Sequence, residues 1–331
     1  MNPDLSIIIP VYNQAPYVAN MLDSIARQKG LITEIIVIDD ASTDNSLEVT
    51  ENWAKNNPRC KILALRQPER QYALAARIKG IQAASAPDIM FADADDILLG
   101  TKRLARVLAQ KKECGAELAH FRTQMTTSDG RFIGEVDFDN LLNIGFLHGK
   151  TMLDLYTQKK WPPGELWGKI YSKELLLRVI QSVEDNIIIY RLDTVLSLLA
   201  IFSAKSYLGC EEFVYEYKIS NSWPLQKFVQ RMHDFPINIA NMFTVCKKAN
   251  VAQFHVASYL NNFFYNFIAW NAGKMCDEFE AAITSGEDAD ELLNSLEEYI
   301  DLDTLLAETL FSAQRNASKI HNCLNRILHE F

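Results

Sequence analysis

The stretch LSIIIPVYNQAPYVANMLDSIARQKGLITEIIVIDD, residues 5–40, decides the fold class of this chain. An apolar, β-branched run opens it at residues 5–12, and a second such run closes it at residues 34–40. Runs of this kind are typical of strands buried on both faces of a parallel sheet. Behind Pro16, a residue common in the first turn of a helix, apolar residues recur at helical spacing: Val18, Leu22 and Ile25. The stretch therefore predicts a strand, a helix and a second strand in succession.

The same alternation continues along the chain. The sequence next predicts a capped helix, a strand, an alanine-rich helix and another strand: residues 42–57, 61–66, 72–85 and 88–93. Such alternation implies βαβ units, and hence an α/β fold whose mostly parallel sheet is covered by helices on both faces. Ligands of these sheets bind in the crevice beyond the carboxyl ends of the strands.

Aspartates follow two of the predicted strands, and we expect them to face one crevice: Asp39, Asp40, Asp93, Asp95 and Asp96. Carboxylates spaced by one residue, as in Asp93-Ala94-Asp95, can present oxygens to Mg²⁺ or Mn²⁺ and leave positions open for substrate phosphates. A carboxylate at a strand end can also accept a hydrogen bond from a base or a ribose hydroxyl. The alternatives are a turn for the short DxD motif and a helix cap for the first pair.

The composition limits the classes of partner. With 331 residues, 48% of them hydrophobic, the chain can form one large domain or two medium ones. A net charge of -9 argues against a nucleic-acid partner, which would require a basic surface. The six cysteines form no CxxC pair, and the sequence contains no secretory signal and no convincing membrane span. We therefore expect a cytoplasmic protein with reduced thiols.

The second half of the chain has a looser pattern. Residues 117–126 and 209–220 are typical of strands, and residues 189–204 of a helix. After Trp223 the composition becomes helical. The sequence thus divides into residues 1–100, residues 101–222 and a helical C-terminal extension, residues 223–331.

Four ordered segments resemble the family 2 glycosyltransferases: LSIIIPVYNQAPYVANMLDSIARQ, EIIVIDDASTDNS, ALAARIKGIQAA and IMFADADDIL. The resemblance is dense over residues 5–100 and continues more weakly to about residue 222. It implies the GT-A fold, a Rossmann-like sheet in which residues 1–100 bind a nucleotide-sugar and residues 101–222 bind the acceptor. Members of the family transfer a sugar from a nucleotide-activated donor, usually with a divalent metal and with inversion at the anomeric carbon.

The resemblance also implies roles for single residues. It places along the nucleotide-sugar Pro10, Val11, Tyr12, Asp39, Asp40, Arg77, Asp93, Ala94 and Asp95. Within this set, Asp39 would meet the base, usually uracil, Asp93 would lie nearer the ribose, and Asp95 would bind Mn²⁺ or Mg²⁺. The segment around Arg77 departs from the family at two points: Ile78 replaces a common asparagine, and QYALA lacks the usual glycines.

The general base and the acceptor side are expected in the second half. Asp193, which opens an apolar helical pattern, is the preferred base; Asp185, in the Glu-Asp step of VEDN, is the runner-up. Trp167 and Lys169 match a segment that lines the acceptor side. Trp167 could equally be a core residue, and Asp193 could also be a helix cap.

Family analogy implies a UDP-sugar donor and a glycan or glycolipid acceptor, as in the synthesis of surface polysaccharide or lipopolysaccharide. The helical extension could form a homodimer, touch the inner face of the membrane, or brace the acceptor site. A phosphohydrolase would require its DxD motif on the first strand, which ends instead in PVYN. The remaining alternative is a catalytically silent nucleotide-binding scaffold that acts through its helical extension.

Overall fold

The computed structural model describes residues 2–127, 130–135, 144–148, 164–181 and 193–219, together with Leu142 and Thr284. Apart from Thr284, the predicted helical extension lies outside these residues, as does the candidate base Asp185. Within the described residues, no helix combines the length and the apolar character that a membrane span requires.

Within the described part of the chain, ten strands form one sheet. They are β1 (Leu5–Val11), β2 (Thr33–Asp39), β3 (Lys61–Arg66), β4 (Asp88–Phe91), β5 (Ile97–Leu98), β6 (Leu118–Thr127), β7 (Phe132–Glu135), β8 (Phe146–His148), β9 (Lys169–Ser172) and β10 (Ser206–Ile219). The helices are α1 (Val18–Ala26), α2 (Ser46–Asn56), α3 (Tyr72–Ala83), α4 (Arg103–Cys114), α6 (Lys173–Gln181) and α7 (Asp193–Ser203). The first helix begins at Val18 rather than at Pro16, and in the turn before it Gln14 O accepts the amide hydrogens of both Tyr17 and Val18.

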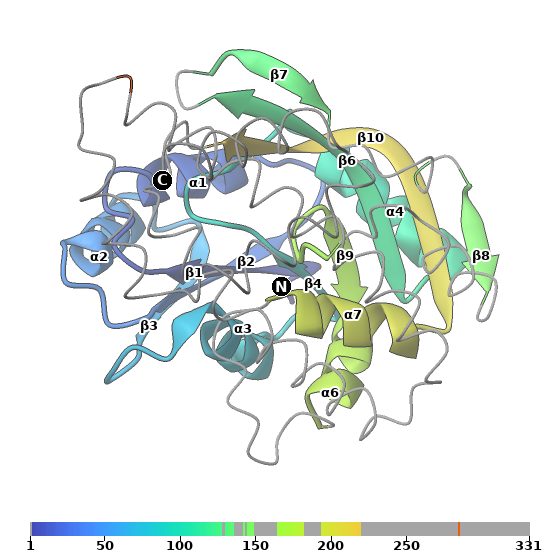
Figure 1. Ribbon diagram of the computed structural model, residues 1–331, viewed down its shortest axis with the longest axis horizontal. Coiled ribbons are helices and arrows are strands. Elements are labelled where there is room, and N and C mark those ends of the chain that lie inside the picture. Colours follow the sequence, from blue (N-terminus) through green and yellow to red (C-terminus); the bar gives the residue numbers. More distant parts are fainter. Residues whose placement is uncertain are drawn as a thin grey trace, which may run out of the picture.

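The sheet is parallel in its first half and mixed in its second (Figure 1). Its strand order is β3-β2-β1-β4-β9-β6-β10-β5, and the first four of these strands are parallel to one another. β9 then pairs antiparallel with both β4 and β6, whereas β6 and β10 are parallel. The α/β fold with flanking helices is thus confirmed, with antiparallel strands added beyond β4.

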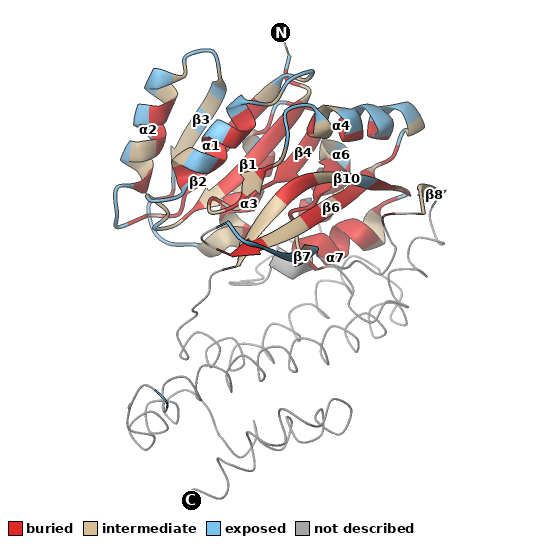
Figure 2. Ribbon diagram, turned by 90° about the horizontal axis from the view of Figure 1, so that it is seen from above, coloured by how far each residue is buried: buried red, intermediate tan, exposed pale blue. Residues whose placement is uncertain are grey.

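Helices cover both faces of the sheet (Figure 1). α1 and α2 pack on one face, and α3, α6 and α7 pack together on the other. The central strands are buried, whereas α1, α2 and α4 each present an exposed face to solvent (Figure 2). This explains the continuous apolar run of β1, in which Ile7, Ile8 and Ile9 have no exposed surface.

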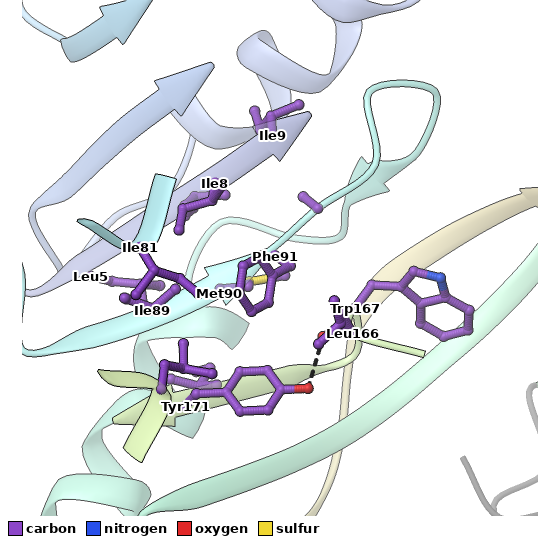
Figure 3. Close-up of a cluster of buried hydrophobic side chains, with 14 of the residues drawn as sticks. Leu5, Ile8, Ile9, Ile81, Ile89, Met90, Phe91, Leu166, Trp167 and Tyr171 are labelled. Carbon is purple, nitrogen blue, oxygen red and sulfur yellow. Dashed lines mark hydrogen bonds between the residues drawn. The ribbon is translucent and has the colours of Figure 1, made fainter. Parts of the chain in front are cut away.

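One hydrophobic core joins the two halves of the sequence (Figure 3). The ring of Phe91 in β4 meets the ring of Tyr171 in β9 edge to face, with centroids 5.6 Å apart. The Tyr171 hydroxyl donates to Leu166 O at 3.2 Å, which satisfies the polar end of a buried side chain (Figure 3). The division at residue 100 therefore runs through one continuous sheet, and the separate roles of the two halves stay a prediction.

Candidate functional site

The carboxyl ends of β1, β2 and β4 bring the predicted site residues together. Val11 and Asp39 are paired at the ends of β1 and β2, and the Asp40 amide donates to Val11 O at 2.8 Å. Beyond β4, the Ala92 amide donates to Ile8 O at 3.1 Å and keeps the chain beside β1 as it leaves the sheet. The first acidic pair and the DxD segment thus follow neighbouring parallel strands.

Asp39 is fully buried, and only one of its two carboxylate oxygens accepts a hydrogen bond in the described part of the chain. Its Oδ2 atom accepts the Ser42 amide at 3.3 Å and lies 3.6 Å from Arg66 Nε. Its Oδ1 atom is buried and has no hydrogen-bond partner in the described part of the chain. A buried carboxylate oxygen without a donor is costly, so this atom is suited to accept a hydrogen bond from a ligand.

Asp40 holds the loop between β3 and α3. Its Oδ1 atom accepts two hydrogen bonds, from Gln67 Nε2 and from the Gln71 amide, both at 2.7 Å. A cap on the next helix does not account for these contacts, since both donors come from a different loop. Asp40 therefore positions residues 67–71 beside the carboxyl end of β2.

This loop carries an arginine that sequence reasoning did not single out. The guanidinium carbon of Arg70 lies 3.8 Å from the ring centroid of Tyr12 and 4.8 Å from that of Tyr72. Tyr72 has a φ of 64°, in the left-handed region that favours glycine. It lies in the segment where the sequence lacks the glycines of the family, so the chain adopts this conformation with a tyrosine. The absence of these glycines is the sequence feature that could have pointed to the unusual backbone conformation at Tyr72.

A buried cation stands among the aspartates. Arg77 of α3 is almost fully buried, and its Nη2 atom lies 2.5 Å from Asp93 Oδ1. The Asp93 side chain keeps 32% of its surface exposed, so it can still face a ligand. The ion pair offsets part of the repulsion between neighbouring carboxylates.

Asp96 faces away from solvent and fastens the acidic segment to β10. Its Oδ2 atom accepts the Tyr215 hydroxyl at 2.7 Å, and its Oδ1 atom accepts the Lys218 amide at 2.8 Å. The same hydroxyl accepts the Asp93 amide hydrogen at 2.9 Å. Burial, followed by the charges of Asp93 and Asp95, raises the pKa of Asp96 well above its usual value.

The residues present fit a metal ion whose coordination would be completed by phosphates of a substrate. Among the described residues, no cluster of three or more histidines, cysteines or acids could hold a metal ion alone. Asp93 and Asp95 are both partly exposed carboxylates. Mg²⁺ is commonly bound by one or two carboxylates together with substrate phosphates and water, and oxygen ligands also suit Mn²⁺.

The two residues predicted on the acceptor side are both buried. Trp167 stacks on Tyr215 and Tyr217 of β10, with ring centroids 5.7 and 5.0 Å apart. Lys169 is fully buried, and its Nζ atom donates to Glu165 O at 2.5 Å. Burial, opposed by the charge of Glu165, lowers the pKa of Lys169 to about 8. Contact of Trp167 and Lys169 with an acceptor stays a prediction.

The position of the general base is described only in part. The predicted apolar helix is present as α7, and its first residue is Asp193. The side chain of Asp193 and the whole of Asp185 lie outside the described part of the chain. The choice between these two carboxylates therefore stays a prediction.

Fold and site together define an α/β protein in which aspartates gather at the carboxyl ends of two strands that flank β1. A family model described as glycosyl transferase family 2 matches residues 6–180, which is more than half of the chain. The chain belongs to glycosyl transferase family 2.

The chain is similar to curated proteins and to solved structures. It is 26% identical over 231 residues to "Uncharacterized glycosyltransferase YibD" of Escherichia coli, covering 69% of this chain and 64% of that protein. It is 33% identical over 141 residues to "PGL/p-HBAD biosynthesis glycosyltransferase" of Mycobacterium bovis, covering 42% of this chain and 54% of that protein. The chain therefore spans less than two thirds of the length of each.

Two solved structures share its fold. TarS 1–349 of S. aureus, in complex with UDP, matches with a TM-score of 0.57 and 18% identity, covering 80% of this chain and 72% of that one. The mannosyltransferase PcManGT of Pyrobaculum calidifontis, in complex with GDP-Man and Mn²⁺, matches with a TM-score of 0.56 and 18% identity, covering 96% and 87%. At this identity the likeness establishes the GT-A fold alone.

Proposed function

We propose that this chain is an inverting glycosyltransferase that moves a sugar from a nucleotide-sugar, a UDP-sugar by preference, to a hydroxyl of a glycan or glycolipid. The observation that carries the proposal is the buried Asp39 Oδ1 atom, which has no donor in the described part of the chain. It lies at the end of the strand next to β1, and the DxD segment follows the strand on the other side of β1. A nucleoside diphosphate supplies both a base N–H for this atom and phosphates for a metal.

In this proposal the nucleoside lies along Pro10, Val11 and Tyr12, with its base N–H donating to Asp39. Asp40 would act indirectly, because its described contacts hold the loop that brings Arg70 against Tyr12. Arg77, paired with Asp93, keeps the acidic segment close to α3. Ala94 lies between the two carboxylates and is buried.

Asp95, with the donor phosphates, would hold Mn²⁺ or Mg²⁺, and Asp93 would lie nearer the ribose. When bound, the metal supplies positive charge that stabilises the departing nucleoside diphosphate. Asp193, or Asp185 as the runner-up, would accept the proton of the acceptor hydroxyl. The hydroxyl oxygen bonds to the anomeric carbon as the bond from that carbon to the diphosphate breaks, with charge development as in glycoside hydrolysis.

We further propose that the product belongs to a cell-surface polysaccharide, a lipopolysaccharide or a glycolipid. The mycobacterial relative is named for PGL/p-HBAD biosynthesis, and a biosynthetic role of this kind supports the proposal for this chain. Cytoplasmic location, peripheral contact with the inner membrane face, and a homodimer through residues 223–331 belong to the same proposal. Sedimentation of the full chain with and without anionic vesicles tests the homodimer and the membrane contact.

A panel of nucleotide-sugars, scored by binding and by nucleotide release with Mn²⁺, Mg²⁺ or chelator, tests the function. We expect one donor to bind in a metal-dependent way. Asp95→Ala should abolish that dependence, and Asp39→Asn should weaken the base contact while metal dependence persists. Asp193→Ala should retain donor binding and lose transfer. Absence of binding by any donor, with or without metal, would refute the proposal.

The alternative is a catalytically silent nucleotide-binding scaffold. Its supporting observation is that Trp167 and Lys169, predicted to meet the acceptor, are both buried. A scaffold would bind a donor in the same panel and release no nucleotide with any acceptor. Turnover that is lost in Asp193→Ala or Asp185→Ala would exclude it.

A further inference from the structure

One hydroxyl group connects the two ends of the acidic segment. The Tyr215 hydroxyl accepts the Asp93 amide hydrogen at 2.9 Å and donates to Asp96 Oδ2 at 2.7 Å. Asp95 lies between these two attachment points in the sequence. Tyr215 itself is fully buried on β10.

The segment has little other support from the sheet. β4 ends at Phe91, and pairing resumes only at β5, where Ile97 and Leu98 meet Glu216 and Tyr215. Between them, Asp96 Oδ1 accepts the Lys218 amide at 2.8 Å, and the Asp96 amide donates to Asp93 O at 3.2 Å. The loop that carries Asp95 is therefore held by a hydrogen bond between its own backbone groups and by hydrogen bonds to β10.

The polar side-chain atoms on both sides of this attachment, those of Asp96 and of Tyr215, have hydrogen-bond partners. Asp96 is a buried carboxylate with a donor for each of its oxygens, and Tyr215 uses its hydroxyl both as donor and as acceptor. Its ring lies parallel to that of Trp167, with an interplanar angle of 5°. Stacking and hydrogen bonds together define the position of the hydroxyl.

We propose that Tyr215 and Asp96 are positioning residues for the metal at Asp95, and this inference rests on the proposed function. They contact neither the metal nor the donor; they hold the backbone on each side of the ligand in one geometry. Groups that orient a metal ligand from behind commonly change metal affinity about 10–100-fold when they are removed. Since Trp167 stacks on the ring of Tyr215, the Tyr215 side chain also connects a residue predicted on the acceptor side to the loop that carries Asp95.

Tyr215→Phe is the direct test, because it removes the hydroxyl and keeps the ring. We expect Mn²⁺ in the presence of UDP to bind about tenfold more weakly to the variant. UDP measured in chelator should bind within about twofold of the wild-type value, because the metal-free contacts of the nucleotide are unchanged. Mn²⁺ affinity is read from the electron paramagnetic resonance signal of free Mn²⁺, and UDP affinity by calorimetry.

Tyr207→Phe is the matched control. Tyr207 is also fully buried on β10, and its hydroxyl meets His120 Nδ1 at 3.3 Å. This variant loses a buried hydroxyl from the same strand and should keep wild-type Mn²⁺ affinity. A purely structural role predicts that both variants lose stability and that neither changes metal affinity.

Asp96→Asn gives a second route if Tyr215→Phe does not fold. An asparagine offers one acceptor oxygen, whereas Tyr215 and Lys218 both donate to Asp96. We again expect weaker Mn²⁺ binding with metal-free UDP binding retained. A folded Tyr215→Phe or Asp96→Asn that binds Mn²⁺ as tightly as the wild type overturns the inference. Wild-type protein whose UDP binding ignores metal overturns the proposed metal site instead.

Discussion

Gly80 of α3 lies directly against Ile8 of β1: a Cβ atom at residue 80 would come within 2.4 Å of Ile8 Cγ2. Gly80→Ala should therefore destabilise the protein by about 1–3 kcal/mol, although alanine is the better helix former. Urea unfolding measures the change. Because Arg77 lies one turn earlier on α3, the variant should also weaken donor binding.

A double-mutant cycle separates this clash from other effects. Ile8→Ala removes the atom that a Cβ at residue 80 would strike, so Gly80→Ala should cost less in the Ile8→Ala background. Strictly additive losses in the free energy of unfolding would contradict the predicted contact.

Lys111 and Asp88 form a buried ion pair at 2.6 Å, with side chains 4% and 7% exposed. Lys111→Met should lower the free energy of unfolding by about 3–5 kcal/mol, because it leaves the Asp88 carboxylate buried without its cation. The neighbouring Lys112 provides the control: its pair with Asp4 is 3.0 Å long, with side chains 44% and 38% exposed. Lys112→Met should cost only about 0–1 kcal/mol. Equal losses from the two variants would refute this assignment.

Asp40→Ala should release the loop that carries Arg70. The change removes an acceptor shared by Gln67 Nε2 and the Gln71 amide, and hydrogen bonds to charged groups contribute about 1.5–3 kcal/mol each. Hydrogen exchange at residues 67–71 should accelerate. Asp40→Asn retains an acceptor oxygen and should restore much of the protection; unchanged exchange in Asp40→Ala would show that other contacts hold the loop.

The lowered pKa of Lys169 predicts that the free energy of unfolding rises with pH. Its pKa is about 8 in the folded protein and 10.5 in its reference state, so between these values the unfolded chain binds more protons. Unfolding therefore becomes harder as pH rises from about 8 to about 10.5. The comparison is between wild type and Lys169→Met: the wild type should gain relative stability across this window. A difference that is independent of pH would mean that Lys169 keeps its ordinary pKa.

Local pattern was enough to predict the first half of the sheet. β1 to β4 are short runs rich in apolar residues and separated by helical patterns, and the site aspartates lie at or just beyond the ends of β2 and β4. β9 was missed, because its four residues, Lys169–Ser172, contain a buried lysine and are followed at once by α6. A strand that short carries no periodic signal, and its pairing with β4 and β6 depends on tertiary contacts.

The support of the site could not be predicted from sequence either. Asp40 and Gln71 are 31 residues apart, and Tyr215 and Asp96 are 119 residues apart. Nothing in residue type distinguishes Tyr215 from Tyr207, whose hydroxyl meets a histidine instead. Motifs indicated which carboxylates gather at the strand ends, whereas the partners of Asp96 and of the Asp93 amide come from β10 and depend on how that strand packs.

The attachment of the acidic segment to β10 also sets an order of assembly during synthesis. β1 to β4 all lie within the first 91 residues and pair with one another as parallel neighbours. The partners of Asp93 and Asp96 on β10, by contrast, are Tyr215 and Lys218. Because a chain leaves the ribosome from its N-terminus, the part of the sheet formed by β1 to β4 can collapse early. The loop that carries Asp95 is attached to β10 only after residue 218 has emerged, so a truncated chain would contain the acidic motif without these hydrogen bonds.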